Sequence, residues 1–561
     1  MLPEKQASVL APVIVGLKVL LLLALFWAVA PAWTPVVFSK VNLFLLHQKY
    51  LVLVVYCAVF FLSILALCIA PFLENWHIRV PLVILFALSF GFDQFIVDIT
   101  GAHLDTSMMR TIWAERSSEI TLDAYAIDIT VNLLRAVIIG LILAFPSAPW
   151  NLGNRWCLVP TSALALVVFI TAYTKGATKE FPAPLAVVGN AVLAAMSTSS
   201  KAVGVKVSYN ETPYPAVQHI LYIIDESVRG DYIQLNNNRL SNTPFLSGLG
   251  GRLINFGVAI SGANCSNASR TILSSGARQN EASDNQNASH LEPGLFQYAK
   301  RAGFRTVVID AWKNMASYRD ASERLAIDVY IPVTDDPPYV RDNRVVEKLL
   351  EILADERPTF IYVSKFGVHF PYDLSYPSQS KPKLQLAQFS LGRLLDFARI
   401  QNAAMDANKR DALVSSYSKA IEWSVDGFFQ NLLPRLDLRR TLLLYTSDHG
   451  QTMWEDGYKS THCSSSHPHP GESYVPLFAL TEATPLEGRF RQGAAHGFNR
   501  ASHFDIVPTL LLAMGYKEDW VSRKFSTNLF DIPRLRHRQF QIGGSAGTEN
   551  WPDGAQWVTV D

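Results

Sequence analysis

The sequence predicts an α-helical transmembrane domain followed by a soluble α/β domain, and two observations support this fold class. Apolar residues make up 49% of the 561 residues and charged residues only 17%, and the first third of the chain is the richest in Leu, Val, Ala and Phe. The remainder alternates short apolar runs with helix-like segments, as α/β domains do. A chain of this length exceeds one compact core, so we expect at least two domains.

Five apolar stretches are long enough to cross a membrane as helices, which takes about 20 residues because lipid cannot hydrogen-bond to the backbone. They are Leu10–Trp33, Leu51–Phe72, Val80–Val97, Ile129–Phe145 and Arg155–Tyr173. The first is interpreted as an anchor rather than a signal peptide, because four more follow. Lys18 is expected to snorkel from one end of its span to the membrane interface. For Asp93 and Arg135 we favour a position near an interface, with a polar path inside the helix bundle as the alternative.

These stretches predict a five-helix transmembrane domain over residues 1–175, a bridging segment over 176–208 and a soluble domain over 209–561. The bridge contains an apolar, helix-like run, Leu185–Met196, that suits a membrane surface. The loop Asp98–Asp128 is long and polar, and loops of that length are usually functional. Five spans place the chain ends on opposite sides of the membrane, but the Lys and Arg residues near the span ends divide four against four and do not orient the chain.

Four apolar runs of the soluble domain are predicted to be buried strands that end in polar residues, and Leu253–Ile260 is strand-like as well. The four runs read HILYIIDES, RTVVIDAW, TFIYVSKFG and TLLLYTSDHG. Helices are predicted at Gly294–Ala302, Val345–Asp355, Leu413–Leu433 and Phe504–Met514. This alternation predicts a largely parallel sheet covered by helices on both faces. In such sheets ligands bind beyond the carboxyl ends of the strands, which is where the polar residues fall.

Residues of metal-binding type follow two of the predicted strands. Asp225 and Glu226 end one strand, and Asp448 and His449 end another, followed by Gly450. Carboxylate oxygens and imidazole nitrogens are common zinc ligands. Turns also favour Asp and Gly, so the second motif alone is a weak signal. The adjacent pair of carboxylates strengthens it, because buried carboxylates are costly without a counter-charge.

A hydroxyl-rich segment, Gly262–Ser275, follows the strand-like run and reads GANCSNASRTILSS. A hydroxyl attacks phosphorus once its proton is removed, and coordination to zinc would allow this at neutral pH. On composition alone, an ordinary turn rich in Ser and Asn is the simpler interpretation. The segment therefore gains weight only in combination with the metal-binding residues.

Together these motifs resemble the alkaline phosphatase/sulfatase superfamily, and within it the membrane-bound phosphoethanolamine transferases, over nearly the whole chain. The resemblance implies an alkaline phosphatase/sulfatase-like fold for the soluble domain and Zn²⁺ as the cofactor. It implies that Ser266 is the nucleophile. The zinc ligands that it implies are Glu226, Ser266, Asp448 and His449.

The resemblance also assigns residues that act on the substrate. It implies catalytic roles for Ser266, His369 and His462. It implies substrate contacts for Glu119, Thr111, Glu115 and His503, of which the first three lie in the long loop. His467 and His469 compete with His462 for the position of a family histidine downstream of the DHG motif.

The activity implied by the resemblance is transfer of phosphoethanolamine from a lipid like phosphatidylethanolamine to a cell-envelope acceptor such as lipid A, a core sugar or a glucan, through a phospho-Ser intermediate. It implies a multi-pass protein of the bacterial inner membrane with its catalytic domain in the periplasm, and we expect a monomer. The net charge of +1 provides no basic field, so no nucleic-acid partner is expected.

The chain departs from the family pattern at several positions. The family nucleophile is usually Thr, and the run Ser266–Arg270 also resembles the signature of Ser-type sulfatases, in which the Ser is oxidised to formylglycine. A membrane-tethered formylglycine sulfatase or phosphodiesterase is therefore the alternative, and a degenerate binding module is a third hypothesis. Thr111 and Glu115 replace two polar family residues, which leaves the acceptor and headgroup preference open.

Cys265 and Cys463 are the only cysteines of the predicted soluble domain, and the other three lie in the predicted spans. If both flank one site, their Cα atoms could approach within the roughly 4.4–6.8 Å that a disulfide needs. An oxidising compartment would then favour the bond. Two unpaired thiols flanking the site are the alternative, and the sequence leaves both open.

Overall fold

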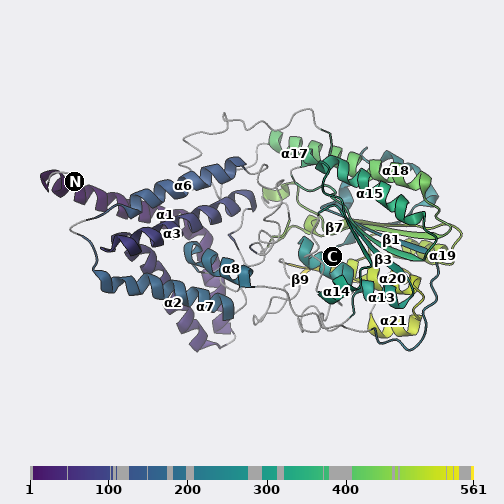
Figure 1. Ribbon diagram of the computed structural model, residues 1–561, viewed down its shortest axis with the longest axis horizontal. Coiled ribbons are helices and arrows are strands. Elements are labelled where there is room, and N and C mark those ends of the chain that lie inside the picture. Colours follow the sequence, from purple (N-terminus) through teal and green to yellow (C-terminus); the bar gives the residue numbers. More distant parts are fainter. Residues whose placement is uncertain are drawn as a thin grey trace. The chain divides into compact units, whose positions relative to one another are not determined.

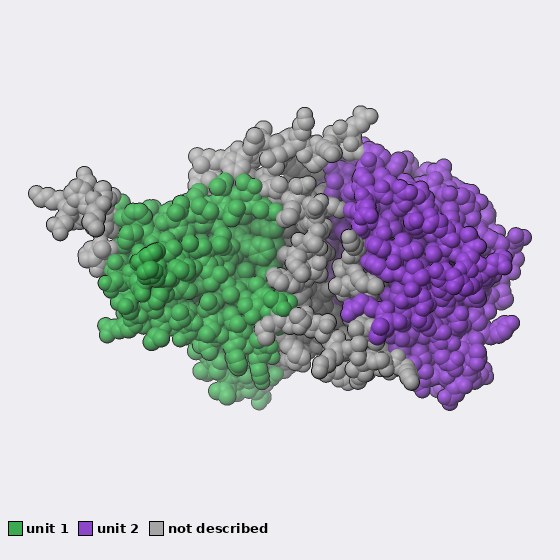
Figure 2. Space-filling view, in the orientation of Figure 1, with its two compact units in different colours: residues 1–198, 382–404 green, residues 199–381, 405–561 purple. Residues whose placement is uncertain are grey.

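The computed structural model divides the chain into two compact units (Figure 2). Residues 1–198 belong to the first unit, and residues 199–381 and 405–561 to the second. The predicted domain boundaries at residues 175 and 208 stay a prediction. The structure describes residues 4–46, 48–100, 103–104, 109, 126–147, 150–173, 181–196, 207–275, 293–312, 321–370, 372–377, 407–457, 462–464, 468–525, 527–534, 536–542 and 557–560.

The first unit is built from apolar helices. They are α1 (Glu4–Leu46), α2 (Tyr50–Ile69), α3 (Trp76–Thr100), α6 (Ala126–Ala144), α7 (Leu158–Tyr173) and α8 (Ala183–Met196) (Figure 1). Helices therefore form at all five predicted spans and at the helix-like run of the bridge. Within the described residues, three helical segments are long and apolar enough to cross a membrane, namely Tyr50–Phe72, Trp76–Val97 and Asn154–Tyr173. The number of five spans stays a prediction.

The predicted snorkelling of Lys18 stays a prediction, but the side chain finds its polar partners inside the unit. Helix α1 extends beyond both ends of the predicted span, and the Lys18 side chain is fully buried. Its Nζ donates hydrogen bonds of 2.6 Å to the carbonyl oxygens of Pro71 and Phe145, which lie at the carboxyl-terminal ends of α2 and α6. The C-terminus of a helix carries partial negative charge, so the ammonium group stabilises two helix ends inside the unit.

Asp93 and Arg135 are also buried, with 1% and 5% of their surface exposed. Asp93 accepts a hydrogen bond from the Leu104 amide at 3.0 Å and lies 2.7 Å from Nδ1 of His103. Arg135 donates to the side-chain oxygen of Asn132 at 3.0 Å. These positions favour the interior alternative over the interface position, because both side chains find polar partners within the unit.

The second unit is a seven-stranded sheet with the order β2-β7-β6-β1-β5-β3-β4. Its strands are β1 (His219–Asp225), β2 (Ile254–Ile260), β3 (Arg305–Asp310), β4 (Val329–Pro332), β5 (Thr359–Ser364), β6 (Thr441–Ser447) and β7 (Tyr474–Leu480). The five strands from β6 to β4 run parallel, and β7 is antiparallel to both of its neighbours. All five predicted strands form, so the predicted α/β class is confirmed.

Helices cover both faces of this sheet, as predicted (Figure 1). One face carries α15 (Pro338–Leu353), α17 (Ala407–Ile421) and α18 (Gly427–Leu432), and the other carries α13 (Leu295–Arg301), α20 (Ile506–Ala513) and α21 (Glu518–Lys524). Alternate β1 residues Ile220, Tyr222 and Ile224 lie in the same hydrophobic core as buried residues of α13 and α20. Every residue of β1 is buried, as expected for a central parallel strand.

The reversed strand β7 determines where the chain after β2 emerges. Because β2 is antiparallel to β7 and β7 to β6, β2 runs parallel to β6 and ends at the same edge of the sheet. The segments that follow β1, β2, β5 and β6 therefore meet beyond one edge. This is the edge where parallel sheets bind their ligands.

A buried ion pair joins the ends of β1 and β5 at this edge. Lys365 and Asp225 are both fully buried, and Nζ lies 2.5 Å from Oδ2 of Asp225. The same ammonium group donates to the Ser424 carbonyl oxygen at 2.6 Å and lies 3.6 Å from Asp342. Asp225 also accepts from the Tyr445 hydroxyl at 2.8 Å. Lys365 thus neutralises Asp225. Of the two adjacent carboxylates, Asp225 and Glu226, only Glu226 then faces the site.

Replacing Lys365 with Met is expected to lower the free energy of unfolding of the second unit by about 3–5 kcal/mol, because Asp225 would remain buried without its counter-charge. Hydrogen exchange followed by mass spectrometry on peptides from β1 and β5 measures this loss. Lys300→Met is the matched control, since it breaks an exposed ion pair with Asp328 and should cost less than about 1 kcal/mol. Equal exchange rates in both variants would contradict the role given to Lys365.

Candidate active site and metal centre

Three buried side chains converge beyond the carboxyl edge of the sheet. Glu226 follows β1, and Asp448 and His449 follow β6, and these neighbouring strands pair residue by residue up to Asp225 opposite Ser447. One ligand atom of each of the three lies within 4.8 Å of the others. His449 Nε2 is 3.5 Å from Glu226 Oε1 and 3.8 Å from Asp448 Oδ2. We call these three residues the ligand cluster.

Hydrogen bonds orient the ligand atoms of this cluster toward one point. Asp448 Oδ1 accepts from the amides of Ser227 and His449 at 3.1 and 2.9 Å, which leaves Oδ2 directed into the site. His449 Nδ1 lies 2.7 Å from the Gly450 carbonyl oxygen. A carbonyl oxygen only accepts, so Nδ1 carries a hydrogen and Nε2 is the atom available to a metal ion.

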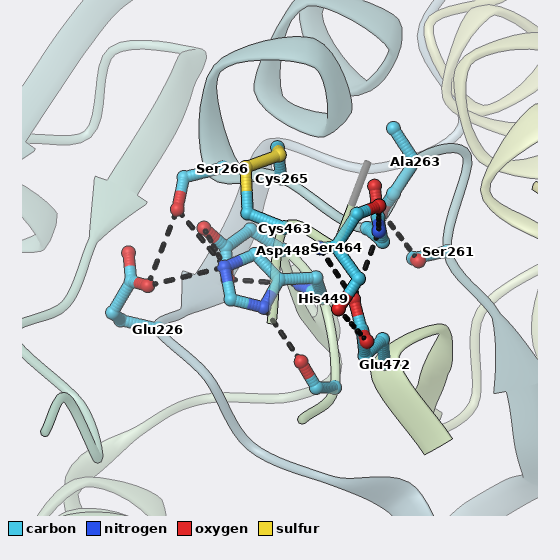
Figure 3. Close-up of a disulfide and its surroundings, with 12 residues drawn as sticks. Glu226, Ser261, Ala263, Cys265, Ser266, Asp448, His449, Cys463, Ser464 and Glu472 are labelled. Atoms are coloured by element: carbon cyan, nitrogen blue, oxygen red, sulfur yellow. Dashed lines mark hydrogen bonds and ion pairs between the residues drawn. A yellow bond between two sulfur atoms is a disulfide. The ribbon is translucent and has the colours of Figure 1, made fainter. Parts of the chain in front are cut away.

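Ser266 lies directly against the ligand cluster (Figure 3). It is the first residue of helix α10 (Ser266–Ser275), which follows β2. Its Oγ is 2.9 Å from His449 Nε2 and 3.4 Å from Glu226 Oε1. The hydroxyl of Ser269 points elsewhere, because it donates to the Asp448 carbonyl oxygen and contacts His503. Of these two hydroxyls, Ser266 is the one placed beside the ligand atoms.

Arg270 completes the charge balance of the site, and the sequence analysis did not single out its side chain. It contacts Glu226 Oε2 through Nη2 at 2.8 Å and Asp448 Oδ2 through Nε at 3.3 Å. Its Nη1 donates to the Ser364 hydroxyl at 2.6 Å. Arg270 follows Ser266 by four residues in α10, so both lie on one face of the helix. That spacing was the signal in the sequence that could have identified it.

The electrostatics of the site show an excess of negative charge. Burial alone lowers the pKa of His449, but the Asp448 and Glu226 carboxylates outweigh it and raise the pKa to about 9. Burial and the nearby Glu226 raise the pKa of Asp448. Burial opposes ionisation of Glu226, yet His449, Arg270 and His369 together hold its pKa well below its usual range. A cluster that stabilises cations in this way suits a divalent metal ion.

The donor set fits zinc. Two carboxylate oxygens, one imidazole nitrogen and a hydroxyl oxygen supply four ligand atoms of the types that zinc binds, and four is its usual coordination number. The fit rests on the chemistry and spacing of these side chains.

The structure brings two further predicted residues to the site. His462 stacks on His449 with ring centroids 4.2 Å apart, and burial is the main cause that lowers its pKa well below the usual range. His369 follows β5, and its ring meets Trp312 edge-on at 4.9 Å. Of the competitors of His462, His469 accepts from the Gly471 amide and lies 3.8 Å from Asp456. His467 lies outside the described residues.

His503 lies behind the nucleophile helix and is 1% exposed. Its Nδ1 is 3.1 Å from the Ser269 hydroxyl and accepts from the Gly262 amide at 3.2 Å, and its Nε2 is 3.2 Å from the Thr446 hydroxyl. Burial lowers the pKa of His503 to about 3. Its contacts brace α10 against β6, and its enclosed position does not favour the predicted substrate contact. Glu119, Thr111 and Glu115 lie outside the described residues.

A disulfide joins Cys265 to Cys463, so the bonded alternative is the one present in the structure (Figure 3). The two Cα atoms are 4.6 Å apart, although 198 positions separate the residues in the sequence. Cys265 directly precedes Ser266, and Cys463 directly follows His462. The bond therefore links the segments that carry two of the predicted catalytic side chains.

Proteins of known structure share this architecture. The integral membrane protein lipooligosaccharide phosphoethanolamine transferase A from Neisseria meningitidis is similar over 85% of this chain and 92% of its own, with 16% identity and a TM-score of 0.54. The zinc complex of the C-terminal periplasmic domain of EcEptC from Escherichia coli covers 63% of this chain and 94% of its own, with 16% identity and a TM-score of 0.46. No curated protein sequence matches.

At 16% identity, the match to the full-length Neisseria protein shows a shared fold only. That shared fold extends over both units of this chain. The sulfatase fold is an enzyme fold, so the predictions of fold class and of an enzyme are confirmed. The family model for sulfatases matches residues 218–516, which is more than half of the chain and includes the whole ligand cluster and Ser266. This chain belongs to the sulfatase family.

Proposed function

We propose that the chain transfers phosphoethanolamine from a membrane phospholipid to an acceptor of the bacterial cell envelope, with Ser266 as the nucleophile. The observation that carries the proposal is the position of Ser266 Oγ, at 2.9 Å from His449 Nε2 and beside the ligand cluster. A hydroxyl at this position is placed both to lose its proton and to attack. Ser266 also lies at the N-terminus of α10, where partial positive charge favours an anionic phosphate.

Glu226, Asp448 and His449, with Ser266 Oγ, are the residues that would hold the zinc ion. When bound, zinc lowers the pKa of a coordinated hydroxyl group and so makes it a nucleophile at neutral pH. The predicted ligand set and the spacing of the cluster agree, which supports the assignment. The zinc complex of the EcEptC domain is a structure of similar architecture.

The residues of the site would act in two steps. In the first, Ser266 Oγ in its ionised form makes a bond to phosphorus, the bond to the diacylglycerol oxygen breaks, and that oxygen takes a proton from His369, while His462 stabilises the reacting group by a hydrogen bond. In the second, the acceptor hydroxyl loses its proton to His369, attacks the phospho-Ser266 and releases the Ser266 oxygen. Arg270 would stabilise the site throughout, because it remains bonded to Glu226 and Asp448. We further infer a monomer in the inner membrane with its catalytic unit in the periplasm.

The acceptor that this proposal favours is an envelope glycolipid such as lipid A with its core sugars, and a glycan such as a glucan is the alternative. The structurally similar protein from Neisseria meningitidis is named for lipooligosaccharide, and its likeness extends over the membrane helices as well. A membrane unit is physically appropriate, because a lipid donor does not leave the bilayer readily.

A second candidate function is a formylglycine sulfatase or phosphodiesterase. The observation that favours it is Arg270, which contacts the ligand cluster as Ser266 does, so both ends of the sulfatase-like run Ser266–Arg270 lie at the site. The two functions differ in the chemical state of Ser266. A transferase leaves phosphoethanolamine on its side chain during turnover, whereas a sulfatase contains an aldehyde at this position.

Ser266→Ala is expected to lower transfer by roughly 10³-fold or more, because the covalent step is lost while the fold is kept. Transfer from labelled phosphatidylethanolamine to lipid A measures the loss. Ser274→Ala is the matched control, because this hydroxyl lies two turns further along α10 and contacts the Thr271 carbonyl oxygen. Mass spectrometry of the Ser266 peptide should find the phosphoethanolamine adduct. An aldehyde there would establish the sulfatase instead, and wild-type turnover in Ser266→Ala would remove the nucleophile assignment.

Removal of any cluster residue is expected to weaken zinc binding by about 10- to 100-fold or more, because fewer donors remain and a buried charge loses its partner. Elemental analysis of purified Glu226→Ala, Asp448→Asn and His449→Ala measures bound zinc, and activity should fall in parallel. Asp328→Asn is the control, since this carboxylate accepts from the Thr306 amide near the start of β3, away from the site, and its loss should leave zinc content unchanged. Full zinc occupancy in Glu226→Ala would exclude this residue as a ligand.

The proposed role of the long loop is recognition of the lipid headgroup by Glu119. Glu119→Ala is expected to lower transfer from bilayer lipid by about tenfold or more, the range for loss of a charged hydrogen bond, and to leave hydrolysis of a small soluble phosphodiester unchanged. Ser118→Ala in the same loop is the control. Equal losses on both substrates would show that Glu119 acts on the chemistry rather than on lipid recognition.

A further inference from the structure

The two segments joined by the disulfide are bonded to one another at more than the sulfur atoms. The Cys463 amide donates to the Asn264 carbonyl oxygen at 2.9 Å, and Nδ2 of Asn264 donates to the Ser464 carbonyl oxygen at 2.9 Å. Residues 264–265 and 463–464 therefore lie side by side (Figure 3). Ser266 directly follows Cys265, and His462 directly precedes Cys463.

Glu472 lies under this contact and bonds both segments. Its Oε2 accepts from Asn264 Nδ2 at 2.8 Å and from the Ser464 amide at 3.0 Å, and its Oε1 accepts from the Ser464 hydroxyl at 2.6 Å. The side chain is fully buried, and burial raises its pKa. Donors from two segments of the chain fix the position of this carboxylate between them.

The backbone of Cys463 makes a sharp turn at this point. Its φ is +64°, a conformation that residues other than glycine rarely adopt and that persists only where the surroundings hold it. The disulfide and the two hydrogen bonds between the segments hold it. Glu472 adds a third kind of attachment, because its carboxylate bonds Asn264 and Ser464, the residues next to the two cysteines.

We propose that Glu472 is a positioning residue that, together with the Cys265–Cys463 disulfide, holds His462 over the ligand cluster opposite Ser266. His462 makes its ring contact with His449 at the end of this fixed turn. The hydrogen-bond partners of the Glu472 side chain are Asn264 and Ser464, and they include neither the ligand cluster nor Ser266. It acts through the position of the His462 ring, and the inference rests on the proposed function, in which His462 contacts the reacting group.

The test is a double-mutant cycle in the full-length, membrane-embedded enzyme. Glu472→Ala is expected to lower kcat by about 10- to 100-fold, because a displacement of about 1 Å costs that much, with KM and zinc content unchanged. Glu472→Gln should restore most of the rate, since an amide oxygen can accept from Asn264 and the Ser464 amide while its NH2 group donates to the Ser464 hydroxyl. In a His462→Ala background, Glu472→Ala should have no further effect.

A hydrogen-bonded carboxylate at the opposite end of the sheet provides the control. Asp328 accepts from the amide and the hydroxyl of Thr306, both at 2.9 Å, near the start of β3. Asp328→Ala should leave kcat unchanged in both backgrounds. If Glu472→Ala does not fold, Ser464→Ala, which removes the 2.6 Å bond alone, enters the same cycle.

Three results would overturn the inference: wild-type kcat in Glu472→Ala, loss of zinc in parallel with the rate, or a loss of the same size in the His462→Ala background. The failure of the proposed function is distinguishable from these. If Ser266 is not the nucleophile, Ser266→Ala retains turnover whatever the cycle shows. If only the positioning role fails, Ser266→Ala remains inactive, while the losses of kcat in Glu472→Ala and His462→Ala multiply in the double variant.

Discussion

The constraint on which the site depends is the burial of two carboxylates, Glu226 and Asp448, beside a hydroxyl group. Two like charges this close are unfavourable unless cations surround them, because the interior screens them poorly. Arg270 bonds both, and His449 has a pKa of about 9 because of them. A divalent cation would satisfy the same demand. The parallel order of β1 and β6 is what forces these residues together, since it carries both strand ends to one edge.

Asp225 and Glu226, the adjacent carboxylates at this edge, bond different cations, Lys365 and Arg270. Asp225 adjoins Glu226 in sequence, yet consecutive residues at a strand end point in opposite directions, and Asp225 turns into the core toward Lys365. That ion pair removes one carboxylate from the site and at the same time ties β1 to β5. The arrangement gives one ligand cluster with a definite charge rather than a diffuse acidic patch.

The sequence predicted those parts of the molecule that depend on local pattern. Strand ends carrying Glu226 and Asp448 follow from apolar runs with polar termini, and the strands formed as expected. It did not predict β7, because Pro476 argues against a strand and the pairing is antiparallel and long-range. Glu472 escaped notice for a similar reason: its three donors come from segments 200 positions apart. The enclosure of Lys18 was not predictable either, because its carbonyl partners follow two other helices.

Charge also indicates which substrates the site can accept. The ligand cluster carries two negative charges, and an ionised Ser266 would add a third. A bound divalent cation and Arg270 together supply three positive charges, so the loaded site is neutral. Without Arg270 it would be negative and would repel an anionic ester. A phosphodiester and a sulfate ester both carry one negative charge, so the cluster accepts either class. Selection of a lipid phosphodiester therefore falls to groups outside the cluster, and in our proposal to the membrane unit that delivers the donor.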